Sequence, residues 1–192
     1  MGYETKVLPA PIYCGMPLTL ALGRRRTSRE FSRDPLDDAT LSTLLWACSG
    51  NTSPDGRRTF PSTLNLQSVR AYAFLSDGVW RYVSEDNTLE RVSSLDARLK
   101  TTNQQLFVGE APLTIVFVAE LDRCQSLVES DYKHCLLVDA GCMVQACQLA
   151  ATALGLASVA RASFQAQAIV EAIGRQPEEL TPLMTITIGK PA

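Results

Sequence analysis

A long stretch of small and apolar residues, at positions 131–154, constrains the fold of this chain more than any other feature. Alanine, glycine, cysteine and valine recur around most of the circumference that a helix here would have, so we predict a helix buried on more than one side. Asp139, Gln145 and Gln148 interrupt the roughly 20 consecutive apolar residues that a bilayer crossing needs. The sequence therefore predicts a central core or dimer-interface helix and no membrane span, and its small residues favour a homodimer packed along it.

Two apolar runs and one turn predict strands around this helix. Residues 113–119 are continuously β-branched, apolar or aromatic, as in a strand buried on both faces, and residues 183–189 repeat the pattern. Residues 70–75 and 79–83 flank an Asp-Gly turn and predict a β-hairpin. Because helices and strands alternate irregularly, the predicted class is α+β with a mixed sheet flanked by helices. At 192 residues the chain is expected to form one domain, residues 1–192.

Shorter elements complete this outline. We predict helices at 16–22, ended by Gly23, from Asp37 or Asp38 to Gly50, and at 166–173. Residues 1–15 contain two prolines and no clear period, so they are expected to form an extended arm that wraps a partner subunit.

Composition excludes several classes of function. The six cysteines include no C-x-x-C pair, which argues against zinc or a redox dithiol and predicts no metal site. His134 is the single histidine and no nucleophile motif is present, so a hydrolase is not indicated. A net charge of -2 with an isoelectric point near 5.5 argues against nucleic acid as a partner. The N-terminus has no apolar signal region, so a cytoplasmic location is expected.

Residues 24–29, R-R-R-T-S-R, place four guanidinium groups and two hydroxyls in six positions. Guanidinium groups bind phosphate oxygens in pairs of hydrogen bonds, so this run is a candidate phosphate clamp. A solvated basic surface is the alternative. Neither a Walker A sequence nor G-x-G-x-x-G is present, which excludes the common nucleotide motifs.

The run at 25–31, R-R-T-S-R-E-F, resembles the R-R-[ST]-x-R-x-F opening of the nitroreductase family of FMN-dependent oxidoreductases. Residues 56–65 resemble the R-x-x-P-S segment of that family, and the hairpin at 77–82 resembles its SagB-type dehydrogenase branch. Further segments match in the family's order, at 111–112, 139–141, 153–156 and 188–191. The resemblance therefore covers nearly the whole chain.

This resemblance implies an α+β sandwich that dimerises extensively, with dimerising arms and FMN at the subunit interface. The residues implied to hold the phosphate and ribityl end are Arg25, Arg26, Thr27 and Arg29. Those implied to line the flavin from the other subunit are Pro61, Ser62, Thr63 and Asn65. Gln105 is the side chain expected at the pyrimidine edge. In the segment 159–164, Ala162 and Ser163 are implied to offer backbone N–H groups to flavin N5 and O4.

Two departures from the family pattern matter for the predicted site. Many relatives have glycine where Ser163 stands and an acidic residue where Ala162 stands. Of the basic C-terminal residues that reach back to the phosphate in many relatives, only Lys190 is present. Arg161 is expected to place positive charge near the flavin N1/O2 edge or over the substrate, or else to lie on the surface.

The resemblance implies a ping-pong reaction in which NAD(P)H reduces FMN and a nitro compound, quinone or similar small molecule accepts the electrons. No side chain is assigned as catalytic, because flavin N5 carries the chemistry. Two alternatives stay open: SagB-like oxidation of a peptide azoline, and a non-catalytic flavin- or phosphate-binding protein.

Overall fold

A seven-stranded sheet forms the centre of the molecule, which we describe from a computed structural model for residues 3–125 and 133–192. The strands are β1 (Thr5–Val7), β2 (Val69–Leu75), β3 (Gly78–Val83), β4 (Thr88–Ser93), β5 (Leu113–Glu120), β6 (Ala157–Arg161) and β7 (Leu180–Gly189). The helices are α1 (Leu18–Arg24), α2 (Asp38–Ser49), α3 (Phe107–Glu110), α5 (Lys133–Ala153) and α6 (Ala166–Ile173), with 3-10 turns η1 (Thr63–Asn65), η2 (Arg98–Thr101) and η3 (Leu121–Arg123). The predicted α+β class is confirmed.

The strand order in the sheet is β1-β4-β3-β2-β5-β7-β6, and the pairs between these strands are antiparallel. The predicted hairpin is strands β2 and β3, where Leu75 pairs with Gly78. Strand β4 was not predicted, because its apolar residues do not alternate clearly. The sequence predicted a mixed sheet, with both parallel and antiparallel neighbours. In the described ranges, parallel pairing occurs at the isolated bridge between Thr27 and Ser158 and not between the named strands.

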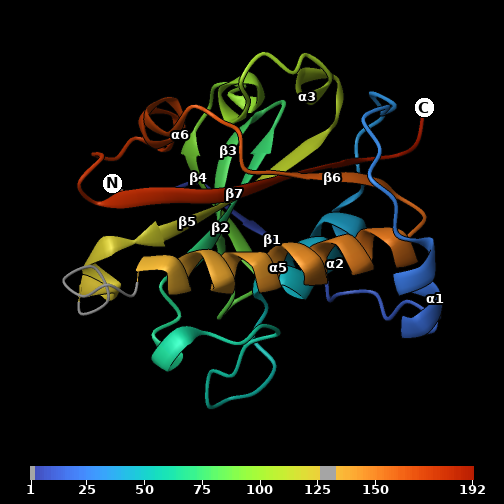
Figure 1. The fold of residues 1–192 in the computed structure, drawn as a ribbon, viewed down its shortest axis with the longest axis horizontal. Helices are drawn as coiled ribbons and strands as arrows, with labels where there is room; N and C mark the ends of the chain where they lie inside the picture. Colours follow the sequence, from blue (N-terminus) through green and yellow to red (C-terminus); the bar gives the residue numbers. More distant parts are fainter. Residues whose placement is uncertain (1–2, 126–132) are drawn as a thin grey trace.

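Helices cover both faces of the sheet (Figure 1). Helices α2 and α5 lie on one face, and α6 with η2 lies on the other. Strand β5 shows why both faces are apolar: Ile115 and Phe117 contact the α2/α5 layer, whereas Val116 and Val118 contact the α6 layer. This alternation follows from the period of two in a strand and explains the continuous apolar run in the sequence.

The predicted central helix is α5, of which residues 133–153 lie within the described ranges and 131–132 do not. Ala140, Met143 and Cys147 are fully buried against the sheet and α2. Residues 134–153 are long and apolar enough to span a membrane by length and composition alone. Since a core helix passes the same test, the burial of this face supports the core assignment.

The N-terminal arm is more firmly attached to its own chain than predicted. Strand β1 pairs with β4, with Thr5 opposite Glu90 and Val7 opposite Thr88. The backbone N–H of Ile12 donates a hydrogen bond to Thr43 Oγ1 of α2 at 2.8 Å. Strand β4 would otherwise be an open edge, and β1 covers it. Only the region around Tyr13, which is 90% exposed, remains extended and free of such contacts in the described chain.

Candidate functional site

The arginine run begins inside a helix, not after one as the sequence predicted. Helix α1 continues through Gly23 to Arg24, and the N–H of Arg25 donates to Ala21 O at 2.9 Å. The chain then runs beside strand β6, where the N–H of Ser28 donates to Ser158 O at 3.0 Å. The segment is thus fixed at the edge of the sheet.

The positive charges of this segment have no carboxylate partners among residues 3–125 and 133–192. Arg26 and Arg29 are exposed and Arg25 is half-buried. One guanidinium nitrogen of Arg26, Nη1, donates to the carbonyls of Gly23 and Arg25, both at 2.8 Å, and so braces the turn. The side chain of Thr27 is exposed beside them. This cluster therefore carries uncompensated positive charge at a defined place in the fold.

The C-terminus returns to the same segment, as the prediction for Lys190 requires. The N–H of Ser32 donates to Lys190 O at 2.9 Å, and Phe31 bridges to Pro191. Lys190 Nζ lies 3.9 Å from Asp34 Oδ2. The end of β7 packs closely against Phe31 and Pro112, and this packing requires glycine at position 189. A Cβ added there would lie 2.7 Å from the Pro112 ring.

Arg161 is buried, which excludes the surface alternative for this residue. Only 6% of it is exposed at the end of strand β6. Its Nη1 donates to Thr101 O and its Nη2 donates to Thr187 Oγ1, both at 2.8 Å, while Nε has no partner in the described part of the chain. Desolvation lowers the pKa of this guanidinium to about 10. The residue therefore remains a cation at neutral pH, surrounded by neutral groups.

Residues 101–105 form a polar wall next to Arg161. Asn103 Nδ2 donates to Ser163 Oγ at 3.1 Å, which joins this segment to the loop after β6. Two buried acceptors, Thr102 Oγ1 and Gln105 Oε1, have no partner in the described ranges. Thr102 follows Thr101, whose carbonyl accepts from Arg161 Nη1, so the segment that carries these two atoms is the one that contacts the buried cation with its own unpaired Nε. Unpaired buried polar atoms are rare, and their clustering is typical of a site that a ligand completes.

Ala162 and Ser163 lie in the short loop between β6 and α6, and both are exposed. The resemblance likened residues 159–164 to a loop of the family, but residues 157–161 belong to strand β6 because they pair with β7. Neither backbone N–H in this loop has a backbone partner within the described chain. The loop therefore presents two free donors beside the polar wall.

The segment 61–65 lies elsewhere in the same chain. Figure 1 shows η1 below the N-terminal half of α5, whereas α1 and the arginine segment lie beyond the other end of that helix. Pro61 and Asn65 are exposed, and Ser62 and Thr63 hydrogen-bond to Asp139 of α5. The structure does not bring these four predicted residues to the arginine segment within one chain. Residues 139–141 were matched to the family from the sequence, but no role was assigned to the Asp139 side chain.

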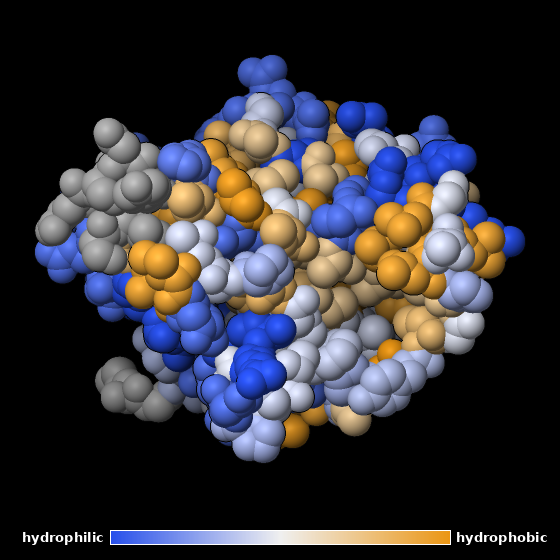
Figure 2. All heavy atoms as spheres, turned by 60° about the horizontal axis from the view of Figure 1, so that its bottom comes forward, coloured by the Kyte–Doolittle hydropathy of each residue, from blue (hydrophilic) through white to orange (hydrophobic). Residues whose placement is uncertain are grey.

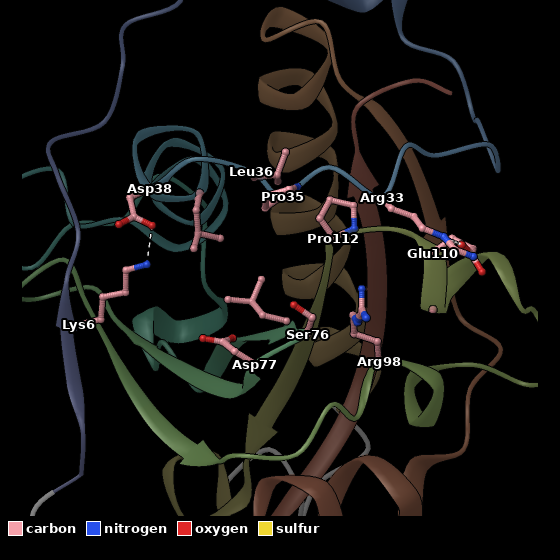
Figure 3. Close-up of a pocket in the computed structure, with 13 residues that line it drawn as sticks. Lys6, Arg33, Pro35, Leu36, Asp38, Ser76, Asp77, Arg98, Glu110 and Pro112 are labelled. Atoms are coloured by element: carbon pink, nitrogen blue, oxygen red, sulfur yellow. Dashed lines mark hydrogen bonds and ion pairs between the residues drawn. The ribbon is translucent and has the colours of Figure 1, made fainter.

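A separate cavity of about 680 Å³ lies between β1, the start of α2 and the β2–β3 turn (Figure 3). None of the predicted site residues lines it. Its charged side chains are paired: Lys6 Nζ lies 2.5 Å from Asp38 Oδ1, Arg33 pairs with Glu110, and Arg98 pairs with Asp96 at 2.7 Å. Because these charges neutralise one another, the cavity offers less to an ionic ligand than the arginine segment does.

Comparisons with known proteins agree on one family. Residues 22–190 match the model of the nitroreductase family. The crystal structure of a nitroreductase-type protein from Ralstonia eutropha JMP134 superposes with a TM-score of 0.91 at 35% identity, covering 98% of this chain and 90% of that one. The nitroreductase-type protein MJ1384 of Methanocaldococcus jannaschii is 26% identical over 97% of this chain and 98% of its own length.

The fold also occurs in a nitroreductase-type protein of Desulfovibrio desulfuricans that was crystallised with FMN, at a TM-score of 0.68 and 22% identity over 92% of this chain and 87% of that one. The family model and the Ralstonia relative each cover most of the sequence. The chain therefore belongs to the nitroreductase family.

Proposed function

We propose that this protein is an FMN-dependent oxidoreductase whose single domain binds one flavin per chain between two copies. The observation that carries the proposal is the buried cation of Arg161, which contacts the segment that holds the unpaired atoms Thr102 Oγ1 and Gln105 Oε1. A buried charge without a counter-charge is costly, so such an arrangement persists where a ligand compensates for it.

The donor and acceptor types of this wall fit the pyrimidine edge of a flavin. That edge offers an N–H donor at N3 and acceptors at N1, O2 and O4. Gln105 Oε1 is an unpaired acceptor suited to the N3–H, and Arg161 carries an unpaired Nε–H donor suited to N1 or O2. The free N–H groups of Ala162 and Ser163 suit O4 and N5. The chain thus offers complementary groups for N3–H, for O4 and N5, and for one of the two acceptors N1 and O2.

The phosphate of FMN fits the arginine segment. Arg25, Arg26 and Arg29 lack carboxylate partners in the described chain, and a phosphate dianion would supply the missing negative charge. The hydroxyl of Thr27 and the ammonium of Lys190 lie on the same segment or next to it. Lys190 is the one basic residue between positions 176 and 192, and the arginine segment supplies the other positive charges in this proposal.

A second copy of the chain completes the site in this proposal. Ser62 and Thr63 are bound to Asp139 in the N-terminal half of α5, whereas α1 and the arginine segment lie beyond the other end of that helix (Figure 1). We therefore assign Pro61, Ser62, Thr63 and Asn65 to the flavin that the partner chain binds. An apolar face supports dimerisation, since Leu18, Leu22, Leu137 and Val138 are each at least half exposed. Figure 2 shows one cluster of apolar side chains at the right of this face, where α1 lies, and smaller separate apolar patches towards the left. Exposed apolar patches of this kind are typical of protein interfaces.

Bound FMN supplies hydride transfer at N5, with NAD(P)H as reductant and a nitro compound or quinone as acceptor. The chain's own residues bind and orient the ring, and the fixed charge of Arg161 stabilises negative charge at the N1/O2 edge. No acid, base or nucleophile is required from the protein. A cytoplasmic location, where NAD(P)H is abundant, suits this reaction.

An absorbance spectrum and a reductant test examine the proposal together. We expect purified protein to be yellow, or to acquire flavin absorbance with added FMN, and NADH or NADPH to bleach it rapidly without oxygen. Colourless protein that takes up no FMN contradicts the proposal. Tight FMN binding with no bleaching by either nucleotide favours the alternatives, a peptide-azoline dehydrogenase or a non-catalytic flavin protein.

A further inference from the structure

Asp139 of helix α5 holds the segment that we propose to line the flavin. Its carboxylate accepts the N–H of Thr63 at 3.0 and 3.1 Å and the hydroxyl of Thr63 at 2.9 Å. It also accepts the hydroxyl of Ser62 at 3.3 Å. Asp139 is only 4% exposed and has no cation within salt-bridge distance in the described ranges. Three donors from two adjacent residues thus converge on one buried carboxylate.

The segment that Asp139 holds has an unusual backbone. Leu64, Asn65 and Gln67 have φ values of 50°, 54° and 49°, in the left-handed region that non-glycine residues rarely adopt. Such conformations persist only where surrounding contacts impose them. Ser62 Oγ, itself bound to Asp139, accepts the N–H of Gln67 at 2.8 Å and so closes the turn. Asp139 therefore anchors the start of the strained turn directly, and its end only through Ser62.

The position of Asp139 also links this turn to the proposed dimer face. Its neighbours on α5, Leu137 and Val138, are 51% and 60% exposed. Leu64, within the turn, is 76% exposed. Asp139 follows two exposed apolar residues of α5, and its carboxylate binds the exposed strained turn. The turn is thereby held next to this part of the helix.

We propose that Asp139 is a positioning residue that presents residues 61–65 of one chain to the flavin held by the arginines of the partner chain. This inference rests on the proposed function, because it requires FMN at the interface. It adds a specific requirement: Asp139 acts on the site of the other copy and not on the site of its own chain.

A first experiment compares D139A and D139N with the wild type and with E120Q. Glu120 is a half-buried carboxylate that accepts from Arg70 Nε at 3.1 Å and touches no proposed site residue, so E120Q controls for the loss of a carboxylate elsewhere in the fold. We expect faster hydrogen exchange of the 61–68 backbone in flavin-free D139A and at least a tenfold higher FMN Kd, with D139N between D139A and the wild type. E120Q should keep the wild-type Kd. A wild-type Kd in folded D139A overturns the inference.

A second experiment tests which copy Asp139 serves. D139A is mixed with a variant carrying R25A and R29A, under conditions that exchange subunits. In the mixed dimer one site carries both defects and the other carries none. At equal mixing about half of the dimers are mixed, so about a quarter of all sites should regain wild-type FMN affinity. If Asp139 served its own chain's site, every site would carry a defect and no affinity would return, which also overturns the inference.

The two failures are distinguishable. If wild-type protein binds no FMN at all, the proposed function fails, and the exchange measurement alone reports whether Asp139 holds the turn. If wild-type protein binds FMN but mixing restores no site, the proposed function stands and the role of Asp139 in the partner's site is wrong.

Discussion

Arg161 Nη2 donates to Thr187 Oγ1 at 2.8 Å, so a buried cation on strand β6 is held by a neutral hydroxyl on strand β7. Thr187 in turn shares a hydrogen bond with Thr114 Oγ1 at 2.8 Å. Desolvation lowers the Arg161 pKa to about 10, below its ordinary value of 12.5, so the folded state releases this proton more easily than the unfolded state. Burial of this charge therefore lowers the free energy of unfolding at neutral pH, and this destabilisation decreases only as pH rises through about 10.

We expect the R161Q variant to make the midpoint potential of bound FMN more negative. The arginine favours the reduced, anionic flavin over the neutral oxidised form, so its loss destabilises the reduced state. A shift of about 30 mV, or about 1.4 kcal/mol for a two-electron couple, is the expected order of magnitude. Dye-equilibrated spectroscopic titration measures this potential.

The R161K variant is the control for this charge. Lysine keeps the positive charge but loses the paired donors to Thr101 and Thr187, so we expect a potential closer to that of the wild type than R161Q shows. Equal potentials in the wild type and R161Q would show that Arg161 does not interact with the flavin ring.

Replacing Arg25 and Arg29 together with alanine should weaken FMN binding without slowing the reaction of protein that is saturated with flavin. Charge-assisted hydrogen bonds contribute about 1.5 to 3 kcal/mol each, so we expect Kd to rise about 100-fold or more. Riboflavin, which lacks the phosphate, should bind the wild type and the double variant with similar affinity. Fluorescence titration with both ligands checks this, and R175A, at an exposed arginine paired with Glu179, should leave both affinities unchanged. An equal loss for riboflavin would mean that the arginines do not act on the phosphate.

The sequence predicted elements whose signal is local and missed those that depend on distant partners. Helix α6 has the predicted bounds because its apolar period and Gly174, at a φ of 77°, mark it locally. Strand β1 was predicted only as an extended arm, because its pairing with β4 joins residues far apart in sequence. The same limit applies to the site: the arginine motif is contiguous, whereas the contact between Asp139 and Thr63 spans 76 positions.

The burial of Arg161 could not be predicted either. Its hydrogen bonds are accepted by the carbonyl of Thr101 and the hydroxyl of Thr187, which are distant in sequence. The adjacent residues, Ala160 and Ala162, do not indicate these partners. Sequence resemblance placed Arg161 near the flavin, but a surface position remained equally open. Only the three-dimensional arrangement separates the two.

The Arg58–Glu85 pair should make stability depend on pH in the acid range. Arg58 Nη2 lies 2.5 Å from Glu85 Oε1, and Arg58 Nε donates to Gln67 Oε1 at 2.8 Å, so the pair ties the loop before η1 to the β3–β4 turn. Desolvation opposes ionisation of Glu85, but the hydrogen bond and charge of Arg58 outweigh it and lower the pKa to about 2, from 4.5. The folded state thus binds this proton less readily than the unfolded state, and the stabilisation disappears as pH falls from about 4.5 through about 2.

Urea unfolding between pH 7 and pH 3 measures this effect. The E85Q variant should be less stable than the wild type at pH 7, and the difference should shrink as pH falls. E178Q, at an exposed glutamate, should follow the wild-type curve throughout. A constant difference between E85Q and the wild type would contradict the linkage.

Placing a charge on the exposed stripe of α5 should separate the proposed dimer. Leu137 is 51% exposed on the chain yet apolar, and a carboxylate there would have to be buried without a partner in an interface formed by two copies of this helix. We expect L137D to sediment as a monomer at micromolar concentration and to lose FMN, because each site would then lack residues 61–65 of the other copy. L95D is the matched control, since Leu95 is 72% exposed but lies after β4, away from α5, and this variant should stay dimeric and yellow. Monomeric L137D that retains wild-type FMN affinity would show that one chain suffices to hold the flavin, and would remove the basis for a shared site.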